Sequence, residues 1–240
     1  MRFLELLGEK SKNLNKTGVP TVAFLGDSVT QGCFECYVDE KGAFETVFDR
    51  EAAYHHDFEK ILALLFPSAP VHIINAGLSG TTAEFGLQRL ERDVLCHHPD
   101  LTVVCFGLND CGKGMNGLGI YTNSLRGIFQ ALRDQGGEVI FMTANMMNPY
   151  VSYHMPEDNL KRFAEQTAKL ENNGILKAYF EAGKQVAREC GVAVCDVYEK
   201  WKKFEAYGVK IPDLLSNYIN HPVREMHWLF ATSLLETLMA

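Results

Sequence analysis

The 240-residue sequence contains no apolar run that approaches the ~20 residues of a membrane-spanning helix. It also lacks an excess of basic residues, since 23 lysines and arginines stand against 30 aspartates and glutamates. A protein that neutralises phosphates is usually basic, so this charge disfavours a nucleic-acid partner. Low-complexity tracts and internal repeats are absent, and 47% of the residues are hydrophobic, which excludes a disordered or fibrous chain.

The cysteines form no disulfide pattern, because there are seven of them and they are scattered along the chain. The first 18 residues lack the long apolar core and the cleavage site of a signal peptide. We therefore expect a reduced, cytoplasmic protein. Cys33 and Cys36 form a CxxC pair, but the sequence has no second CxxC or HxxxH to complete a zinc site. We expect two ordinary thiols and no metal.

Five short apolar runs predict strands, at residues 22–25, 71–74, 101–106, 139–142 and 192–195. Their continuous hydrophobicity is typical of parallel strands that are buried on both faces. Helical patterns occupy the stretches between them, at 51–66, 81–95, 119–134 and 157–189, with a break near 172–174 and a last helix from about Pro222 to Leu238. This alternation predicts a doubly wound α/β domain.

Four polar motifs follow predicted strands or lie in the last loop: GDSVTQG at 26–32, NAGLSGTT at 75–82, GLND at 107–110 and HP at 221–222. Each has a simpler interpretation when taken alone. Asp27 and Ser28 are typical helix caps, and Asn109 and Asp110 are typical turn residues. The GxSxG elbow of α/β-hydrolases is absent around Ser28. Ligands of open α/β sheets bind beyond the carboxyl ends of the strands, which is the edge where these motifs meet.

In their order and spacing these motifs resemble those of the SGNH/GDSL hydrolase superfamily, over nearly the whole chain. The resemblance implies a flavodoxin-like three-layer α/β/α sandwich with a five-stranded parallel sheet, in one domain over residues 1–240. It also implies hydrolysis of a small-molecule ester by a serine nucleophile, with no cofactor. By matching position, Ser28 is the expected nucleophile and His221 the general base, while the expected oxyanion-hole donors are Ser28, Gly80 and Asn109. His227 is expected to be structural.

One departure from the superfamily concerns the group that orients the histidine. The superfamily usually has an aspartate three residues before it, where this chain has Tyr218. A backbone carbonyl could orient the ring of a Ser–His dyad, Asn217 or Asn220 could supply the acceptor, or a carboxylate could come from elsewhere in the fold. The departure also leaves room for a binding protein that has kept the cleft and lost the chemistry.

The loops at 33–50 and 143–157 are expected to line the cleft, and they mix aromatic with polar residues. This mixture favours a small-acyl, acetyl-type ester of a carbohydrate, with Asp27, Asn145 and Tyr150 as candidate binding residues. A lysophospholipase or a thioesterase is the alternative.

Residues 112–117 match the GxGxxG motif of dinucleotide-binding proteins. They do not follow a strand tightly, and no acidic residue stands at the end of the next strand as that motif requires, so we expect a loop there. The sequence predicts no oligomeric state.

Overall fold

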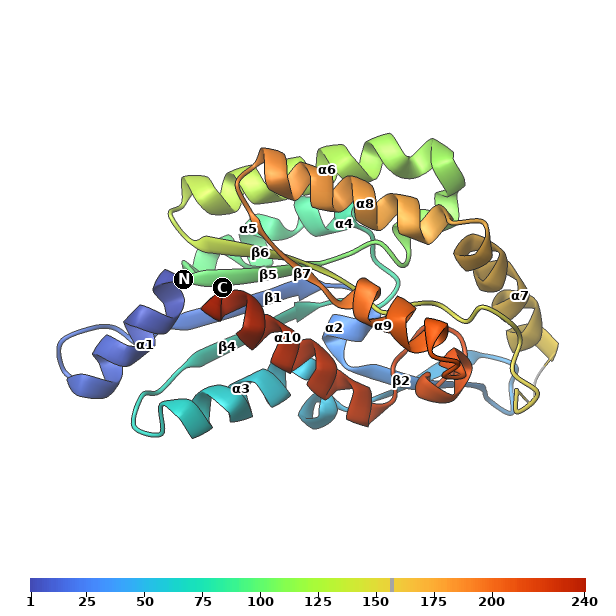
Figure 1. The fold of residues 1–240 in the computed structure, drawn as a ribbon, viewed down its shortest axis with the longest axis horizontal. Coiled ribbons are helices and arrows are strands. Elements are labelled where there is room, and N and C mark those ends of the chain that lie inside the picture. The colour runs from blue at the N-terminus through green and yellow to red at the C-terminus, as the bar shows by residue number, and fades with distance from the viewer. Residues whose placement is uncertain (156–157) are drawn as a thin grey trace.

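The centre of the protein is a parallel β-sheet, seen in the computed structural model of Figure 1, which describes residues 1–155 and 158–240. Its strands are β1 (Thr21–Gly26), β4 (His72–Gly77), β5 (Leu101–Cys105), β6 (Glu138–Thr143) and β7 (Ala193–Asp196). They lie in the order β4-β1-β5-β6-β7, and each neighbouring pair is parallel. This is a flavodoxin-like order, which reverses direction between β1 and β5. The predicted five-stranded α/β fold is confirmed.

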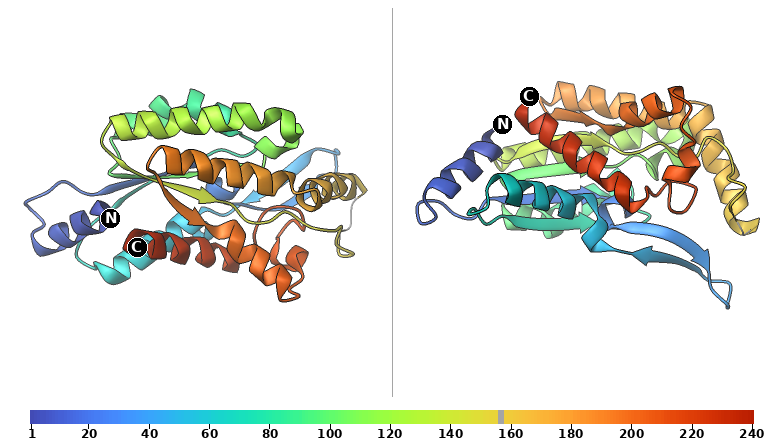
Figure 2. Two further views of the ribbon diagram at one scale, coloured as in Figure 1. Left: turned by 45° about the horizontal axis from the view of Figure 1, so that its top comes forward. Right: turned by 60° about the horizontal axis from the view of Figure 1, so that its bottom comes forward.

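Helices cover both faces of this sheet (Figure 2). One face carries α4 (Ala83–Gln88), α5 (Leu90–Asp93), α6 (Leu118–Asp134) and α8 (Ile175–Glu189). The opposite face carries α1 (Arg2–Lys12), α3 (Tyr54–Leu65) and α10 (His227–Met239). Beyond the carboxyl ends of the strands lies α7 (Asp158–Asn172), and α9 (Val197–Ala206) follows β7 (Figure 1). Within the described residues, none of these helices is long and apolar enough to cross a membrane.

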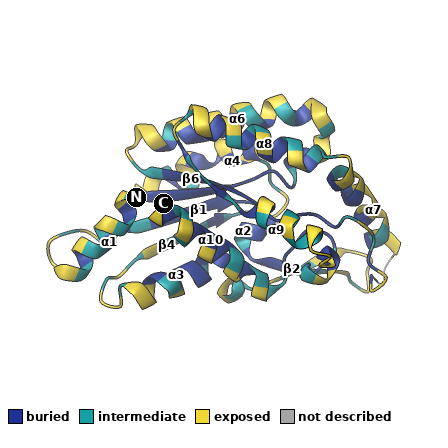
Figure 3. Cartoon of the chain, in the orientation of Figure 1, coloured by how far each residue is buried: buried dark blue, intermediate teal, exposed yellow. Residues whose placement is uncertain are grey.

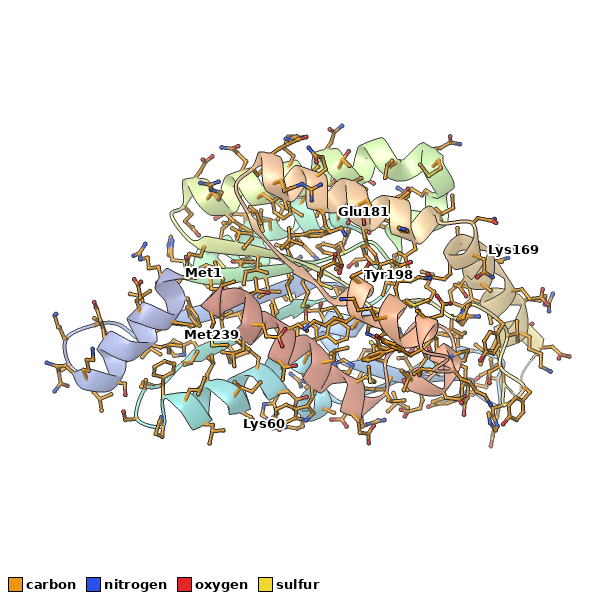
Figure 4. All side chains as sticks on the ribbon, in the orientation of Figure 1. Met1, Lys60, Lys169, Glu181, Tyr198 and Met239 are labelled. Atoms are coloured by element: carbon orange, nitrogen blue, oxygen red, sulfur yellow. The ribbon has the colours of Figure 1, made fainter. Side chains whose placement is uncertain are left out.

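The core lies between the sheet and the two helix layers, where Figure 3 shows continuous burial and Figure 4 shows the side chains that fill the space. All of β5 is buried, as its apolar run predicts. On the opposite side of the sheet from α6, the Tyr54 ring meets Phe24 edge-on at 5.6 Å and stacks on Phe230 at 5.4 Å. The two termini lie together, since the Met1 amino group donates to the Leu238 carbonyl at 3.0 Å.

The predicted strands agree with the observed ones to within three residues at each end. The predicted helix break is also observed, because Gly174 takes a left-handed conformation (φ +71°) between α7 and α8. The last helix begins later than predicted, at His227 behind a 3₁₀ turn (Arg224–Met226), because Pro222 is held in a β-bridge with Leu215. The stretch at 112–117 lies in a 3₁₀ helix (Asp110–Gly117) instead of a loop.

A two-stranded antiparallel ribbon, which the sequence patterns did not predict, projects from the carboxyl edge of the sheet (Figure 2). It consists of β2 (Cys33–Val38) and β3 (Phe44–Phe48). The ribbon is only partly buried, so its sequence carries neither a continuous apolar run nor a clean alternation. The pairing shifts between Cys33 and Cys36, which is the mark of a β-bulge, and this shift takes Phe34 and Glu35 out of the regular ladder.

Gly77 provides a test of how closely β4 packs against the helix after β1. A Cβ at Gly77 would lie 2.3 Å from the Gln31 backbone nitrogen and 2.6 Å from the Thr30 carbonyl carbon. We expect Gly77→Ala to lower the free energy of unfolding by about 1–3 kcal/mol, because backbone must move to make room. Gly119→Ala is the matched control, since a Cβ there meets nothing within 4 Å. Urea unfolding of both variants measures the difference, and equal stabilities would contradict the close packing.

Candidate active site

The chain leaves β1 through a sharp connection into the one-turn helix α2 (Ser28–Gln31). Glycine is required at position 26, because a Cβ would lie 2.8 Å from the Cys105 carbonyl oxygen. Asp27 caps α2, since its side chain accepts a hydrogen bond from the Val29 N–H at 3.0 Å. Ser28 is thereby held at the carboxyl edge of the sheet, beside the point where the strand order reverses.

Ser28 and His221, which are 193 positions apart in the sequence, are in direct contact. Ser28 Oγ lies 3.0 Å from His221 Nε2, and both residues are almost fully buried. The other ring nitrogen, Nδ1, lies 2.8 Å from the Phe34 carbonyl oxygen. A carbonyl oxygen only accepts hydrogen bonds, so Nδ1 carries the proton. The lone pair of Nε2 is left to accept from the Ser28 hydroxyl.

Burial sets the charge of this histidine. Removal from water lowers the pKa of His221 from 6.5 to about 4, although the Phe34 carbonyl and the Glu35 charge act in the opposite direction. At pH 7 the ring is therefore neutral. A neutral imidazole with its lone pair directed at a serine hydroxyl can take a proton from that hydroxyl.

Asn217 shapes the loop that carries His221. Its side-chain oxygen accepts hydrogen bonds from the backbone N–H groups of Ile219, Asn220 and His221, at 3.0, 2.9 and 3.0 Å. Its side-chain nitrogen donates to the side-chain oxygen of Asn220 at 2.9 Å. The intervening Tyr218 has a left-handed backbone (φ +58°), which is uncommon for a tyrosine. One asparagine side chain therefore fixes the backbone from which the His221 ring projects.

The acceptor for Nδ1 is the backbone carbonyl of Phe34, which was one of the three alternatives. The alternative in which Asn217 or Asn220 supplies this acceptor is not observed, because the Asn217 oxygen is occupied by backbone N–H groups and the Asn220 oxygen accepts from Asn217. Within the described residues no carboxylate oxygen bonds to the ring, and Cys36 Sγ lies 3.8 Å from Nδ1. A backbone carbonyl has no side-chain signature, so the sequence could not identify it.

Two of the predicted oxyanion-hole donors are unpaired backbone N–H groups. In the described part of the chain, the backbone N–H groups of Ser28 and Gly80 bond to no other protein group. Gly80 has a φ of +74°, which favours glycine, and a Cβ there would meet nothing within 4 Å. The Asn109 side-chain nitrogen donates to the Thr81 carbonyl at 3.0 Å and lies 3.5 Å from Asp27 Oδ2. The structure thus brings Asn109 to the residue that precedes Ser28.

Two buried carboxyl groups support these segments. Burial raises the pKa of Asp27 to about 7, and the neighbouring Asp110 raises it too, against the hydrogen bond from Val29. Burial likewise raises the pKa of Asp110 to about 6. Asp110 Oδ1 accepts from the N–H of Ala83, the first residue of α4, at 2.9 Å, while Oδ2 has no partner. Asp110 therefore anchors α4, a role that its interpretation as a turn residue missed.

Two of the predicted substrate-binding residues face inward. Asn145 is fully buried, and its side-chain nitrogen donates to the carbonyls of Met146 and Asn220, both at 2.8 Å. Asp27 is 1% exposed and serves as the cap of α2. Both side chains therefore form bonds within the protein, and Asn145 holds the backbone next to His221. Their contact with a ligand stays a prediction. Tyr150 is 47% exposed on the loop after β6, and its role stays a prediction.

A cavity of about 350 Å³ opens beside α2, and its lining consists of Gln31, Phe48, Arg50, Asn75 and Gly77. The Gln31 side-chain oxygen accepts from the Ser79 N–H at 2.7 Å, so the cavity adjoins the segment that carries Gly80.

His227 is fully buried and accepts from the Tyr54 N–H at 3.0 Å, which makes it structural, as expected.

The described cysteines are all free thiols. Burial raises the pKa of Cys33 to about 12 and also raises that of Cys36, so neither CxxC thiol is a ready thiolate. Among residues 1–155 and 158–240, no three histidine, cysteine, aspartate or glutamate side chains are grouped to hold a metal ion.

Sequence comparison finds relatives that match parts of this chain. An acetylxylan esterase of Geobacillus stearothermophilus is 30% identical over 87 residues, which are 36% of this chain and 38% of that protein. An arylesterase of Vibrio mimicus is 32% identical over 97 residues, 38% of this chain and 48% of that protein. The aligned part therefore spans less than half the length of either curated relative.

Solved structures share the fold. A two-domain esterase active on acetylated mannans has a TM-score of 0.66 and 19% identity, over 99% of this chain and 52% of that chain. A variant of Axe2, an acetyl-xylooligosaccharide esterase of Geobacillus stearothermophilus, has a TM-score of 0.65 and 21% identity, over 93% and 96% of the two chains. A sequence profile for GDSL-like lipases and acylhydrolases matches residues 24–229, nearly the whole chain. The protein therefore belongs to the GDSL-like lipase/acylhydrolase family.

Proposed function

We propose that this protein is a serine esterase that removes small acyl groups, chiefly acetyl, from esters of carbohydrates. The observation that carries the proposal is the 3.0 Å contact between Ser28 Oγ and His221 Nε2, with Nδ1 bound to a carbonyl. This pair has the geometry of a nucleophile and its general base. Ser28 and His221 are the two residues to which the proposal assigns catalysis.

In the first half-reaction the Ser28 oxygen attacks the ester carbonyl carbon, and His221 Nε2 takes the hydroxyl proton. The tetrahedral intermediate places a negative charge on the former carbonyl oxygen. Its collapse breaks the bond to the alcohol oxygen, which leaves with the proton from Nε2, and the acyl group stays on Ser28. In the second half-reaction a water molecule gives its proton to Nε2, attacks the acyl carbon, and releases the acid and the serine hydroxyl.

The unpaired donors around Ser28 suit the negative charge of both intermediates. The backbone N–H groups of Ser28 and Gly80 form no other hydrogen bond among the described residues, so they can donate to an oxyanion without breaking one. The Asn109 side-chain nitrogen holds Asp27 only at 3.5 Å, so its second hydrogen is available to an oxyanion. Loss of one such donor typically costs ~2.7–4 kcal/mol of transition-state stabilisation.

The substrate class rests on the cavity beside α2 and on the relatives. Its lining includes two amides, a guanidinium and one aromatic ring, which suits a molecule with hydroxyl groups and flat apolar faces better than a long acyl chain. The two relatives described as acting on acetylated xylan and mannan point to the same class. We therefore favour an O-acetylated sugar over a lysophospholipid or an acyl thioester.

The serine mechanism is tested by replacing the nucleophile. We expect the protein to hydrolyse p-nitrophenyl acetate, and Ser28→Ala to lower kcat at least about 10³-fold, because no other group takes the acyl chain. Ser68→Ala is the matched control, since this serine is exposed and bonds only to Ser11. A Ser28→Ala variant with the rate of the unaltered protein would refute the mechanism.

Substrate choice is tested with a series of p-nitrophenyl esters and with acetylated sugars. We expect kcat/KM to be greatest for the acetyl ester and to fall by at least about tenfold at the octanoyl ester, because most of the side chains that line the cavity beside α2 are polar. Release of acetate from acetylated xylo- and manno-oligosaccharides, measured enzymatically, tests the alcohol part. A kcat/KM that rises with acyl length would favour the lipase alternative.

The pH dependence follows from the buried base. The fall of kcat/KM at acid pH reports the pKa of the base in the free enzyme, because only neutral His221 can take a proton. Because the pKa of His221 is about 4, activity should persist from pH 7 to about pH 5 and fall by half near pH 4. If the base were an ordinary exposed histidine, kcat/KM would fall by half near pH 6.5. Rates of p-nitrophenyl acetate hydrolysis across this range distinguish the two cases.

Two controls keep this measurement interpretable. Burial lowers the pKa of His55 to about 4 and of His227 to about 3, so the fold loses stability as the pH falls below 6.5, where the unfolded chain takes up protons first. Full recovery of activity after return to pH 7 separates titration from unfolding. Asp27→Asn removes the carboxyl beside Ser28 whose pKa is about 7. If kcat/KM of this variant still falls by half near pH 6.5, the prediction for His221 is contradicted.

A further inference from the structure

Arg224, three residues after His221, connects the histidine loop to the projecting ribbon. Its two terminal nitrogens bond to both carboxylate oxygens of Glu35, at 2.6 and 3.1 Å. Its Nε donates to Asp49 Oδ2 at 3.0 Å. The guanidinium also lies 4.3 Å from the centre of the Phe34 ring. One side chain therefore uses both its fork of donors and its flat face.

The contacts of Arg224 link the histidine loop to the segment that carries the hydrogen-bond acceptor of His221. Phe34, whose carbonyl accepts from Nδ1, directly precedes Glu35, so the peptide unit that holds this carbonyl ends at a residue that Arg224 binds. Asp49 is tied to the start of β2, because its N–H donates to the Gly32 carbonyl at 2.9 Å. Arg224 thus holds the acceptor segment from both strands of the ribbon and is itself part of the histidine loop.

The ribbon needs such a tie to aim a carbonyl accurately. A two-stranded ribbon is only marginally stable by itself. The bulge between Cys33 and Cys36 frees the Phe34 carbonyl from the ladder, which makes it available to His221 but also removes a bond that would fix it. Arg224, Glu35 and Asp49 are each about a third exposed or more, so these ion pairs add little to stability. Their contribution is to geometry.

We propose that Arg224, with Glu35 and Asp49, is a positioning residue that replaces the orienting aspartate of the superfamily by holding the Phe34 carbonyl on Nδ1 of His221. The proposal rests on the proposed function, since it assumes that His221 acts as the general base. Arg224 itself touches neither substrate nor the reacting atoms.

The test compares Arg224→Met with Arg126→Met, in p-nitrophenyl acetate hydrolysis. Arg126, on α6, forms a similar exposed ion pair with Glu189, on α8. We expect Arg224→Met to lower kcat about 10- to 100-fold with KM within twofold, because the base is misaligned by a fraction of an ångström. Arg126→Met should keep the kcat of the unaltered protein. Adding Glu35→Gln to Arg224→Met should cost little more, because the two residues act as one unit.

The acid limb of the pH profile distinguishes positioning from a general loss of structure. The titratable or charged groups around His221 are Cys36 and Glu35 from β2, Arg224 from the 3₁₀ turn and His227 from α10. Arg224→Met leaves the Glu35 charge without its partner, so the limb should move to higher pH. Glu35→Gln removes that charge, so the limb should move to lower pH. Partial unfolding would not shift the acid limbs of the two variants in opposite directions.

The outcomes separate the two proposals. If Ser28→Ala abolishes hydrolysis while Arg224→Met retains kcat within twofold, the positioning role is overturned and the serine mechanism stands. If Ser28→Ala is as active as the unaltered protein, the proposed function fails and takes the positioning role with it. Circular dichroism checks folding. Should Arg224→Met not fold, Glu35→Gln decides, because a kcat within twofold and an unmoved acid limb would overturn the proposal.

Discussion

The hydrogen bond between His221 Nδ1 and the Phe34 carbonyl is the constraint on which the chemistry of this site depends. It fixes which ring nitrogen carries the proton and directs the lone pair of Nε2 at Ser28. A carbonyl does this without a negative charge, so it stabilises the imidazolium less than an aspartate would. Burial lowers the pKa of His221 to about 4, and the hydrogen bond to the carbonyl offsets this effect only in part. In the proposed mechanism a base this weak suits an ester, because an alcohol leaves more easily than an amine, and the proposed oxyanion donors then carry more of the catalysis.

The buried carboxyls beneath the site satisfy two opposing demands. Asp27 must accept a hydrogen bond to hold the first turn after β1, yet a full negative charge there would repel an oxyanion forming beside Ser28. Burial, with Asp110 nearby, raises the pKa of Asp27 to about 7, so near pH 7 the group is less ionised than an exposed aspartate, and it still accepts from the Val29 N–H. The structural cap and the electrostatics of the site are thus compatible because the carboxyl is removed from water.

The sheet and the contact between Ser28 and His221 could be predicted from sequence because each depends on side chains in recognisable patterns. Buried parallel strands need continuous apolar runs, and the four motifs follow them in order. The acceptor of Nδ1 could not be predicted, because it is a main-chain atom freed by a bulge in a ribbon that is too exposed to carry an apolar pattern. Asn145 is predicted to face a ligand because the loop at 143–157 is expected to line the cleft and mixes polar with aromatic residues. Its burial depends on the loop of Asn220, which only the folded chain shows.

The proposed nucleophile and the proposed base are positioned by different physical means, and this division determines how each responds to change. Ser28 follows β1 and Asn109 follows β5, so the hydrogen-bonded core of the sheet sets their separation. His221 stands on an irregular loop, and its position depends on the polar contacts of Asn217 and on the ribbon. A core substitution therefore acts on both partners through stability, as any loss of packing does. A substitution in the polar network leaves the sheet intact and displaces the proposed base alone, because the ring is held by Asn217 and the Phe34 carbonyl and not by the strands of the sheet.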